Sequence, residues 1–195
     1  MTDNLTPNSA ENLDIEEELK IPSDRGRERS TARWLALQVL YEIDSTDHPR
    51  GEVMSHHLQH YSLQEKTRKY TYTLVNGVLD DLERLDMIAQ TVAQEYPLDT
   101  IAVIDRNILR IAIFEYAMLR DLPVGVVVDE AVWLSTEFGA DTSPRFINGV
   151  LGAIFRNEER LTAMLTAEMP PEDEDDDFYD DDEDHEDEEE KDELR

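Results

Sequence analysis

The sequence predicts an all-α fold of about seven helices joined by short connections. Through most of the central part of the chain, apolar residues recur every three or four positions, which is the spacing of one apolar face on a helix. Short clusters of Pro, Gly, Asp and Ser separate these stretches. No segment has a convincing strand pattern, and the chain shows no repeat period.

The chain is strongly acidic, but its charge is concentrated at the two ends. Of the formal net charge of -29, residues 167–195 carry -17, from 19 acidic and two basic residues. Residues 1–23 carry -5, which leaves -7 for the part between. Polar, acidic tails bury too little apolar surface to offset the entropy of ordering them. We therefore expect three parts: a disordered extension over 1–24, one helical domain over 25–165 and a disordered tail over 166–195.

The first helix is expected over about 30–44, with Ser30 or Thr31 as its N-cap. A cluster of turn residues over 45–51 separates it from a second, shorter helix near 53–61. The apolar stripe of the first helix consists of residues spaced three or four apart: Ala32, Ala36, Val39, Leu40 and Ile43.

The third and fourth helices share residues 64–95, a stretch too long for one ordinary globular helix. We expect the break at Gly77 and at the pair Asp80 and Asp81. Pro97 is expected to end the fourth helix, because its ring blocks the helical conformation of the residue before it.

The fifth helix is the most apolar, and we expect Asp99 or Thr100 to cap it. Arg110 interrupts its apolar face. We interpret Arg110 as one half of a structural ion pair with Glu115 or Asp105, and keep a direct binding role as the alternative.

The last two helices follow a tight connection over 121–125. The sixth is expected over 126–138, with Gly139 as a left-handed cap. Ser143 and Pro144 then predict an N-cap followed by proline at the first helical position, and the seventh helix extends to about residue 165.

The sequence lacks the residue patterns of several functional classes. It contains no cysteine, so disulfides and thiolate metal sites are excluded, and we expect a cytoplasmic protein. No segment approaches the roughly 20 apolar residues of a membrane span, and the first residues show no leader pattern. None of the nucleophile, phosphate-binding, dinucleotide-binding or zinc-protease motifs occurs. We therefore expect no catalytic activity and no cofactor.

Three histidines near the second helix are the strongest candidates for a metal site. His56 and His60 are four residues apart and could face one ion. No nearby Cys or paired carboxylate completes a tetrahedral set. We interpret these two residues and His57 as a polar helix face or as interhelix hydrogen bonding, and predict no metal.

The strongest candidate for a binding segment is a cluster of four arginines at the start of the first helix. Arg25, Arg27, Arg29 and Arg33 lie within nine residues, and an arginine-rich segment of this kind can order on RNA. The same pattern also fits a solvated helix start whose arginine stems cover apolar surface. The charges alone do not decide between these two interpretations.

Two longer stretches carry a resemblance to a known family. ARWLALQVLYEID over 32–44, and DRNILRIAIFE followed by LPVGVVVDEAVWLSTEFGADTSPRFINGVLGAI over 105–154, resemble the NusB family of transcription antitermination factors. The likeness covers residues 25 to about 160. It implies a seven-helix bundle of two small helical subdomains without enzymatic activity.

The resemblance also implies partners. The family binds the boxA element of nascent ribosomal RNA as single-stranded RNA. It does so together with NusE, a small-subunit ribosomal protein, and helps RNA polymerase in the antitermination complex to read through terminators. Some members self-associate, so a homodimer is left open.

Site residues can be carried over from the family by position. Asp105 matches an acidic residue on the face that meets the basic ribosomal protein, where opposite charge would steer encounter. Phe146 fits core packing as well as base stacking, and Asn148 could instead satisfy a backbone group. The expected RNA-binding residues are Arg25, Arg27, Arg29, Arg33, Gln38, Tyr41, Phe146 and Asn148.

The chain departs from the family where the arginine run is densest. Ser30 and Thr31 stand where the family has basic residues, and Glu28 interrupts the run. Fewer phosphate contacts predict weaker RNA binding, so a partner protein is expected to be needed for tight binding. The acidic tail would either compete with RNA for the arginines or serve as a solubilising segment.

Two other functions fit the same residues. The chain could be a protein adaptor that binds a basic ribosomal protein without touching RNA. It could also be related to the targeting domain of ribosomal RNA methyltransferases, although a following cofactor-binding domain would then be needed.

Overall fold

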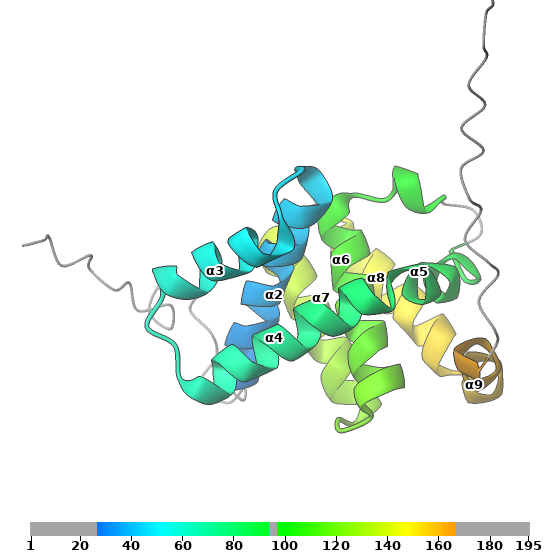
Figure 1. Ribbon diagram of the computed structural model, residues 1–195. Helices are drawn as coiled ribbons and strands as arrows, with labels where there is room; N and C mark the ends of the chain where they lie inside the picture. Colours follow the sequence, from blue (N-terminus) through cyan, green and yellow to red (C-terminus); the bar gives the residue numbers. More distant parts are fainter. Residues whose placement is uncertain (1–26, 94–96, 167–195) are drawn as a thin grey trace, which may run out of the picture.

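The computed structural model describes residues 27–93 and 97–166 and confirms the all-α class (Figure 1). In this part of the chain none of the helices is long and apolar enough to cross a membrane. A 3-10 turn, η1 (Leu98–Thr100), and a π-helical turn, η2 (Glu115–Leu119), flank α6. The α helices are α2 (Arg27–Ser45), α3 (Arg50–His60), α4 (Glu65–Asp80), α5 (Leu82–Gln90), α6 (Val103–Phe114), α7 (Val124–Phe138), α8 (Ser143–Phe155) and α9 (Glu158–Thr166).

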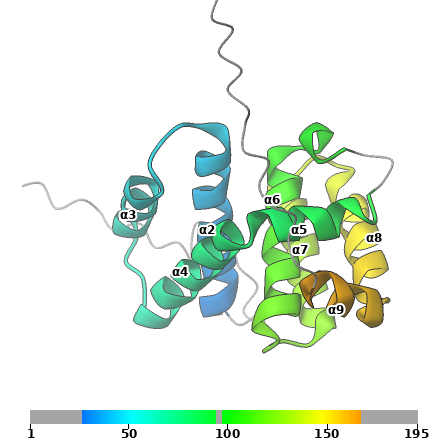
Figure 2. The same ribbon diagram turned by 45° about the vertical axis from the view of Figure 1, so that its right-hand side comes forward.

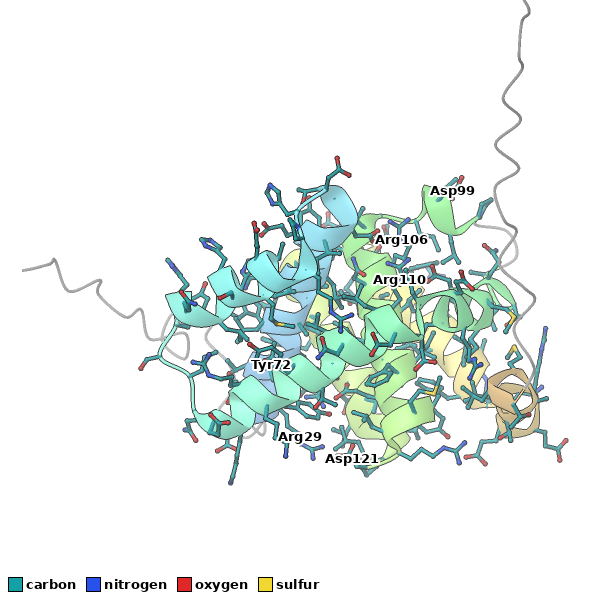
Figure 3. All side chains as sticks on the ribbon, in the orientation of Figure 1. Arg29, Tyr72, Asp99, Arg106, Arg110 and Asp121 are labelled. Carbon is teal, nitrogen blue, oxygen red and sulfur yellow. The ribbon has the colours of Figure 1, made fainter. Side chains whose placement is uncertain are left out.

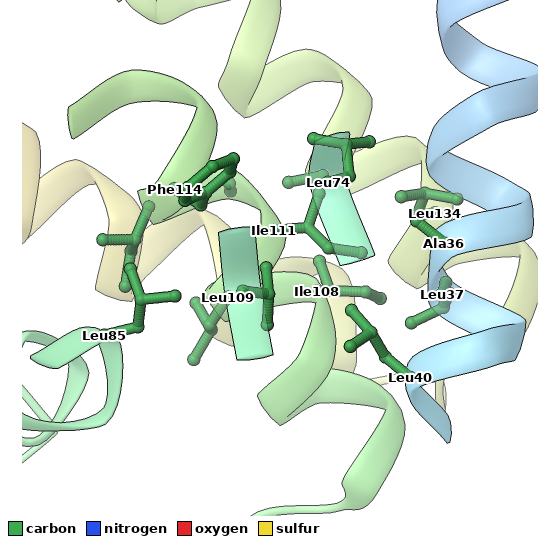
Figure 4. Close-up of a cluster of buried hydrophobic side chains, with 14 of the residues drawn as sticks. Ala36, Leu37, Leu40, Leu74, Leu85, Ile108, Leu109, Ile111, Phe114 and Leu134 are labelled. Carbon is green, nitrogen blue, oxygen red and sulfur yellow. The ribbon is translucent and has the colours of Figure 1, made fainter. Parts of the chain in front are cut away.

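The helices gather into two groups, as the family resemblance implies. In Figure 2, α2, α3 and α4 lie on one side, and α5 to α9 lie on the other. Helix α6 joins the groups, because it packs against α2 and α4 as well as against α5, α7 and α8. Its apolar residues are buried on most faces, as its composition predicts. Figure 4 shows side chains of α2, α4, α5, α6 and α7 meeting in this core.

Helix α2 begins earlier than predicted, and the predicted cap is wrong. The helix starts at Arg27, so Ser30 and Thr31 lie inside it and are both buried. The hydroxyl of Ser30 donates to Glu130 Oε2 of α7 at 2.7 Å instead of capping its own helix. A local sequence window cannot contain this partner, which lies 100 residues away.

The predicted break between α4 and α5 is confirmed at Asp81, but Gly77 has another role. Gly77 lies inside α4, and a Cβ atom at this position would be 1.9 Å from Cζ of Phe114. The glycine therefore allows α4 to approach the aromatic ring of α6 closely. Pro97 does not end α5, which stops at Gln90; it precedes η1 instead.

The predicted N-caps of the later helices are wrong, and Gly139 caps α7 at the predicted position but without the predicted left-handed geometry. Asp99 and Thr100 belong to η1, and α6 starts after Ala102. Gly139 has a φ of -88°, so it is not a left-handed cap. A Cβ atom there would be 2.6 Å from the carbonyl oxygen of Ser135 and from Ser143 Cβ, so close packing explains this glycine.

The last predicted helix is two helices. Helix α8 starts at Ser143, after Thr142 in the N-cap position, and ends at Phe155. Helix α9 follows Asn157, whose side-chain oxygen accepts a hydrogen bond from the backbone N–H of Arg160 at 3.0 Å. The described residues therefore contain eight α helices rather than the seven that were expected.

The predicted partners of Arg110 are wrong. Its guanidinium donates to Asp86 Oδ2 of α5 at 2.7 Å and to Asp44 Oδ2 of α2 at 2.9 Å. Residues five apart on a helix point about 140° away from each other, so neither Asp105 nor Glu115 faces Arg110. This buried arginine thus links α6 to both groups of helices.

Candidate nucleic-acid interface

The start of α2 positions the predicted arginines differently from one another. Arg25 lies outside the described residues, and Arg27 is the first residue of α2. The side chain of Arg29 is 42% exposed and donates to Asp121 Oδ2 at 2.8 Å. Its Cζ atom lies 4.8 Å from the centroid of the Tyr70 ring, so the guanidinium sits over an aromatic face. Figure 3 shows Arg29 and Asp121 at the same end of the molecule.

Arg33 is enclosed by protein. It is only 2% exposed, and its Nε atom donates to both carboxylate oxygens of Glu115 at 3.0 and 2.8 Å. Its Nη1 atom donates to Glu130 Oε2 at 3.2 Å. Tyr70 adds a hydrogen bond from its hydroxyl to Glu115 Oε1. Arg33 therefore ties α2 to η2 and α7, and its predicted contact with RNA stays a prediction.

The charges in this network stabilise one another. Burial alone would lower the pKa of Arg33, but the Glu115 and Glu130 carboxylates outweigh it and raise that pKa above its ordinary value. Burial and the neighbouring Glu115 carboxylate both raise the pKa of Tyr70. Tyr70 therefore keeps its proton at neutral pH and acts as a hydrogen-bond donor to Glu115.

A basic pocket lies between the starts of α2 and α4. It has a volume of about 270 Å³, and its lining includes the side chains of Arg29, Lys66, Lys69 and Tyr70. Glu28 and Thr73 complete the lining. Sequence reasoning missed the two lysines. The signal was the segment EKTRKY over 65–70, with three basic residues in four positions beside an aromatic one.

The other end of α2 presents a different surface. The axial distance from Arg29 to Tyr41 is about 18 Å, at a rise of about 1.5 Å per residue. Tyr41 is 44% exposed. It lines a mainly apolar pocket of about 290 Å³ with Gln38, Trp34, Ile104 and Phe138 among others. The side-chain nitrogen of Gln38 is buried without a hydrogen-bond partner among the described residues.

The start of α8 adjoins the start of α6. The hydroxyl of Ser143 donates to Asp105 Oδ2 at 2.8 Å and accepts a hydrogen bond from the backbone N–H of Ala140 at 3.0 Å. Burial raises the pKa of Asp105, which is 8% exposed, while the hydrogen bond from Ser143 opposes that shift. Phe146 packs partly against the core, and Asn148 is exposed. The predicted roles of Asp105, Phe146 and Asn148 stay predictions.

Two histidines, His48 and His57, contact the carboxylate of Glu42, and the contact of His57 joins two helices. His57 Nε2 lies 2.8 Å from Glu42 Oε2, which joins α3 to α2, and His48 Nδ1 lies 2.8 Å from Glu42 Oε1. Hydrogen bonds from His48 and His57 lower the pKa of Glu42. No group of three potential metal ligands occurs within residues 27–93 and 97–166.

The structure thus divides the predicted RNA-binding residues between two places. Arg29 lies at the basic pocket, with Arg33 buried one turn further along α2. Gln38 and Tyr41 share the apolar pocket at the far end of that helix. Ile104 lines that pocket, and the next residue, Asp105, accepts a hydrogen bond from Ser143. The pocket therefore lies close in sequence to a contact with the start of α8.

Comparisons with known proteins identify the family that this chain resembles. The NusB family model matches residues 30–156. The chain is 41% identical over 126 residues to the transcription antitermination protein NusB of Bacillus subtilis (strain 168), covering 65% of this chain and 93% of that protein. It is 36% identical over 128 residues to the protein of the same name from Roseiflexus castenholzii, covering 65% and 90%.

A solved structure shows the same fold. The crystal structure of the antitermination factors NusB and NusE in complex with double-stranded RNA contains a similar chain, with a TM-score of 0.62 and 26% sequence identity. The match covers 68% of this chain and 98% of that one.

Proposed function

This chain belongs to the NusB family, and on that basis we propose that it is a cytoplasmic, non-enzymatic transcription antitermination factor. It binds boxA-type single-stranded RNA in nascent ribosomal RNA transcripts together with NusE, and it promotes read-through by RNA polymerase. The domain that carries this function spans residues 25–165, between two acidic tails.

The observation that best supports RNA binding is the basic pocket between α2 and α4. In a chain with a net charge of -29, Arg29, Lys66 and Lys69 lie around one cavity of about 270 Å³. Affinity for RNA depends on cations placed close to phosphates, so this local charge matters more than the net charge. The solved complex of NusB with NusE and RNA provides the second support.

We assign the predicted residues to separate tasks. Arg29 and the basic residues before it hold phosphates, while Tyr41 provides an exposed aromatic ring for an unstacked base. Arg33 acts through Glu115 and Tyr70, which position Arg29. Asp105 serves the partner protein. The remaining proposed RNA contacts are Arg25, Arg27, Gln38, Phe146 and Asn148.

Fluorescence anisotropy with a labelled boxA-type RNA tests the proposed function. The full chain is titrated alone and with purified NusE, and the binding of NusE itself is measured by calorimetry. We expect RNA binding that becomes tighter when NusE is present. Absence of RNA binding in both titrations, with NusE binding intact, would instead identify the chain as a protein adaptor.

Replacing Tyr41 with alanine tests the aromatic end of the interface. Stacking of one base on an aromatic side chain contributes about 1–3 kcal/mol, so Tyr41→Ala should weaken RNA binding by about 5- to 150-fold. Tyr72→Ala is the matched control, because Tyr72 is 41% exposed on α4. Equal affinities of the two variants would remove Tyr41 from the interface.

A further inference from the structure

We propose that Arg29, Lys66 and Lys69 together form a binding site for consecutive phosphates of single-stranded RNA. The inference rests on the proposed function and extends it, because it assigns part of the RNA contact to α4. Arg29 on α2 would then form only one wall of the site. The other wall would be the face of α4 that meets it.

The two lysines lie on the face of α4 that lines the pocket. Lys66 and Lys69 are three residues apart, and Tyr70 follows four residues after Lys66, so all three belong to one helix face. Helix α4 packs along α2, which brings this face to Arg29. The cavity of about 270 Å³ between them is lined by three cations and by Glu28 as its acidic member.

Neither lysine has a structural partner in the described part of the chain. Both side chains are exposed, and among residues 27–93 and 97–166 the structure records no carboxylate within ion-pair distance of either amine. Arg29, Arg33, Arg106 and Arg110 all have such partners. Within the described part of the chain, no carboxylate therefore blocks the amines of Lys66 and Lys69 from a phosphate.

The position of these lysines is unfavourable for the helix itself. Lys66 lies in the first turn of α4, where the helix dipole disfavours positive charge. Two like charges three residues apart also repel each other. Residues that break a local rule without a compensating contact are expected at functional sites. Binding of an anion would relieve both effects.

Arg29 is already held in place for such a ligand. The Tyr70 ring lies under its guanidinium, and Tyr70 is itself fixed by its hydrogen bond to Glu115. Asp121 holds one nitrogen of Arg29 at 2.8 Å. Ordering a long side chain before binding reduces the entropy lost when the ligand arrives.

The test replaces both lysines by glutamine in the full chain and measures RNA affinity as a function of salt. The affinity for single-stranded RNA falls with salt, and each phosphate contact makes the slope of log affinity against log salt steeper by about 0.7. Lys66→Gln/Lys69→Gln removes two such contacts, so the slope should become shallower by about 1.4. At 0.1 M salt this corresponds to about 25-fold weaker binding. The affinities for boxA-type RNA and for scrambled RNA should fall equally, because phosphates carry no sequence information.

Arg156→Gln/Arg160→Gln is the matched control, since it removes the same charge from exposed positions at α8 and α9. Equal slopes for the two double variants would overturn the proposal. Unchanged or tighter binding by the lysine variant would also overturn it. If the unmodified chain binds no RNA with or without NusE, the proposed function itself fails. Circular dichroism verifies that both variants are folded.

Discussion

The starts of α2 and α4 both carry cations and pack against each other, yet they use their charge differently. Arg33 on α2 is enclosed, and two carboxylates neutralise it. Lys66 and Lys69 on α4 are exposed and have no carboxylate partner in the described residues. A run of basic residues therefore indicates where cations are, whereas burial and ion-pair partners decide whether each cation stabilises the fold or can bind a ligand.

The largest expected effect comes from removing the enclosed charge. Arg33→Met leaves the buried carboxylates of Glu115 and Glu130 without their cation, so the free energy of unfolding should fall by about 3–5 kcal/mol. Urea denaturation followed by circular dichroism measures the change. Adding Glu115→Gln and Glu130→Gln to this variant should recover part of the loss, because the stranded charges are then gone.

Arg29→Met is the matched control on the same helix. Its pair with Asp121 is about 40% exposed on both sides, so its loss should cost less than about 1 kcal/mol. If Arg29→Met and Arg33→Met destabilise the protein equally, the distinction between an enclosed and an open cation at this end of α2 is wrong.

The next effect concerns the close packing of α4 against α6 at Gly77. Gly77→Ala places a Cβ atom 1.9 Å from Cζ of Phe114, so overpacking should lower the free energy of unfolding by about 1–3 kcal/mol. Gly51→Ala in α3 is the control, because nothing lies within 4 Å of its Cβ position. That substitution should be neutral or stabilising by up to about 1 kcal/mol. Stabilisation by both substitutions would refute the close approach of α4 to α6.

A smaller effect is expected where Asp44 accepts hydrogen bonds from Arg106 and Arg110. Asp44→Asn weakens these bonds and should lower the free energy of unfolding by about 1 kcal/mol. Burial would raise the pKa of Asp44, but these arginines outweigh it and hold that pKa below its ordinary value of 3.8. The stabilisation is therefore present above pH 3.8 and is lost as the pH falls below it.

Urea midpoints between pH 6 and pH 3 measure this dependence. The unmodified chain should lose more stability over that range than Asp44→Asn, which starts lower at pH 6. Parallel curves for the two proteins would show that Asp44 does not contribute to the acid sensitivity.

The smallest effect on the free energy of unfolding is expected from replacing the exposed lysines of α4. Lys66→Gln/Lys69→Gln should leave the free energy of unfolding unchanged or raise it by a few tenths of a kcal/mol, since repulsion and the unfavourable dipole contact are removed. The same urea experiment measures it. A loss above about 1 kcal/mol would mean that the lysines hold the fold, in the manner of Arg33.

The central parts of the helices could be predicted from the sequence, because the spacing of apolar residues within a segment indicates the buried face of that helix. The break at Asp81 and the apolar character of α6 follow from the same local pattern. Helix starts and the partners of buried polar groups could not be predicted as well, because the groups concerned contact distant residues. Ser30 contacts Glu130, 100 residues away, and Arg110 contacts Asp44, 66 residues away.

The glycines illustrate a second limit. Gly77 was expected to mark a break but lies inside α4, and Gly139 caps α7 without the expected left-handed geometry. Both permit close contact with another element. A sequence shows that a side chain is missing, but not which atoms occupy its place.

The candidate site was only partly visible in the sequence. The four arginines form one cluster along the chain, yet folding buries Arg33 and leaves Arg29 half exposed. Lys66 and Lys69 could not be connected to Arg29 without knowing that α4 packs along α2. The family resemblance gave the function, while the packing of these helices determines which cations are accessible.

The ion pairs of α2 also constrain how the chain folds during synthesis. Ser30 and Arg33 find their carboxylates 82 to 100 residues later, on η2 and α7. At about 5–20 residues per second, a ribosome needs about 4–20 s to make that length of chain. During this interval Arg33 lacks its carboxylate partners, although α3 and α4 are already present to cover part of the apolar face of α2. The N-terminal half of the domain therefore depends on the C-terminal half to complete its fold.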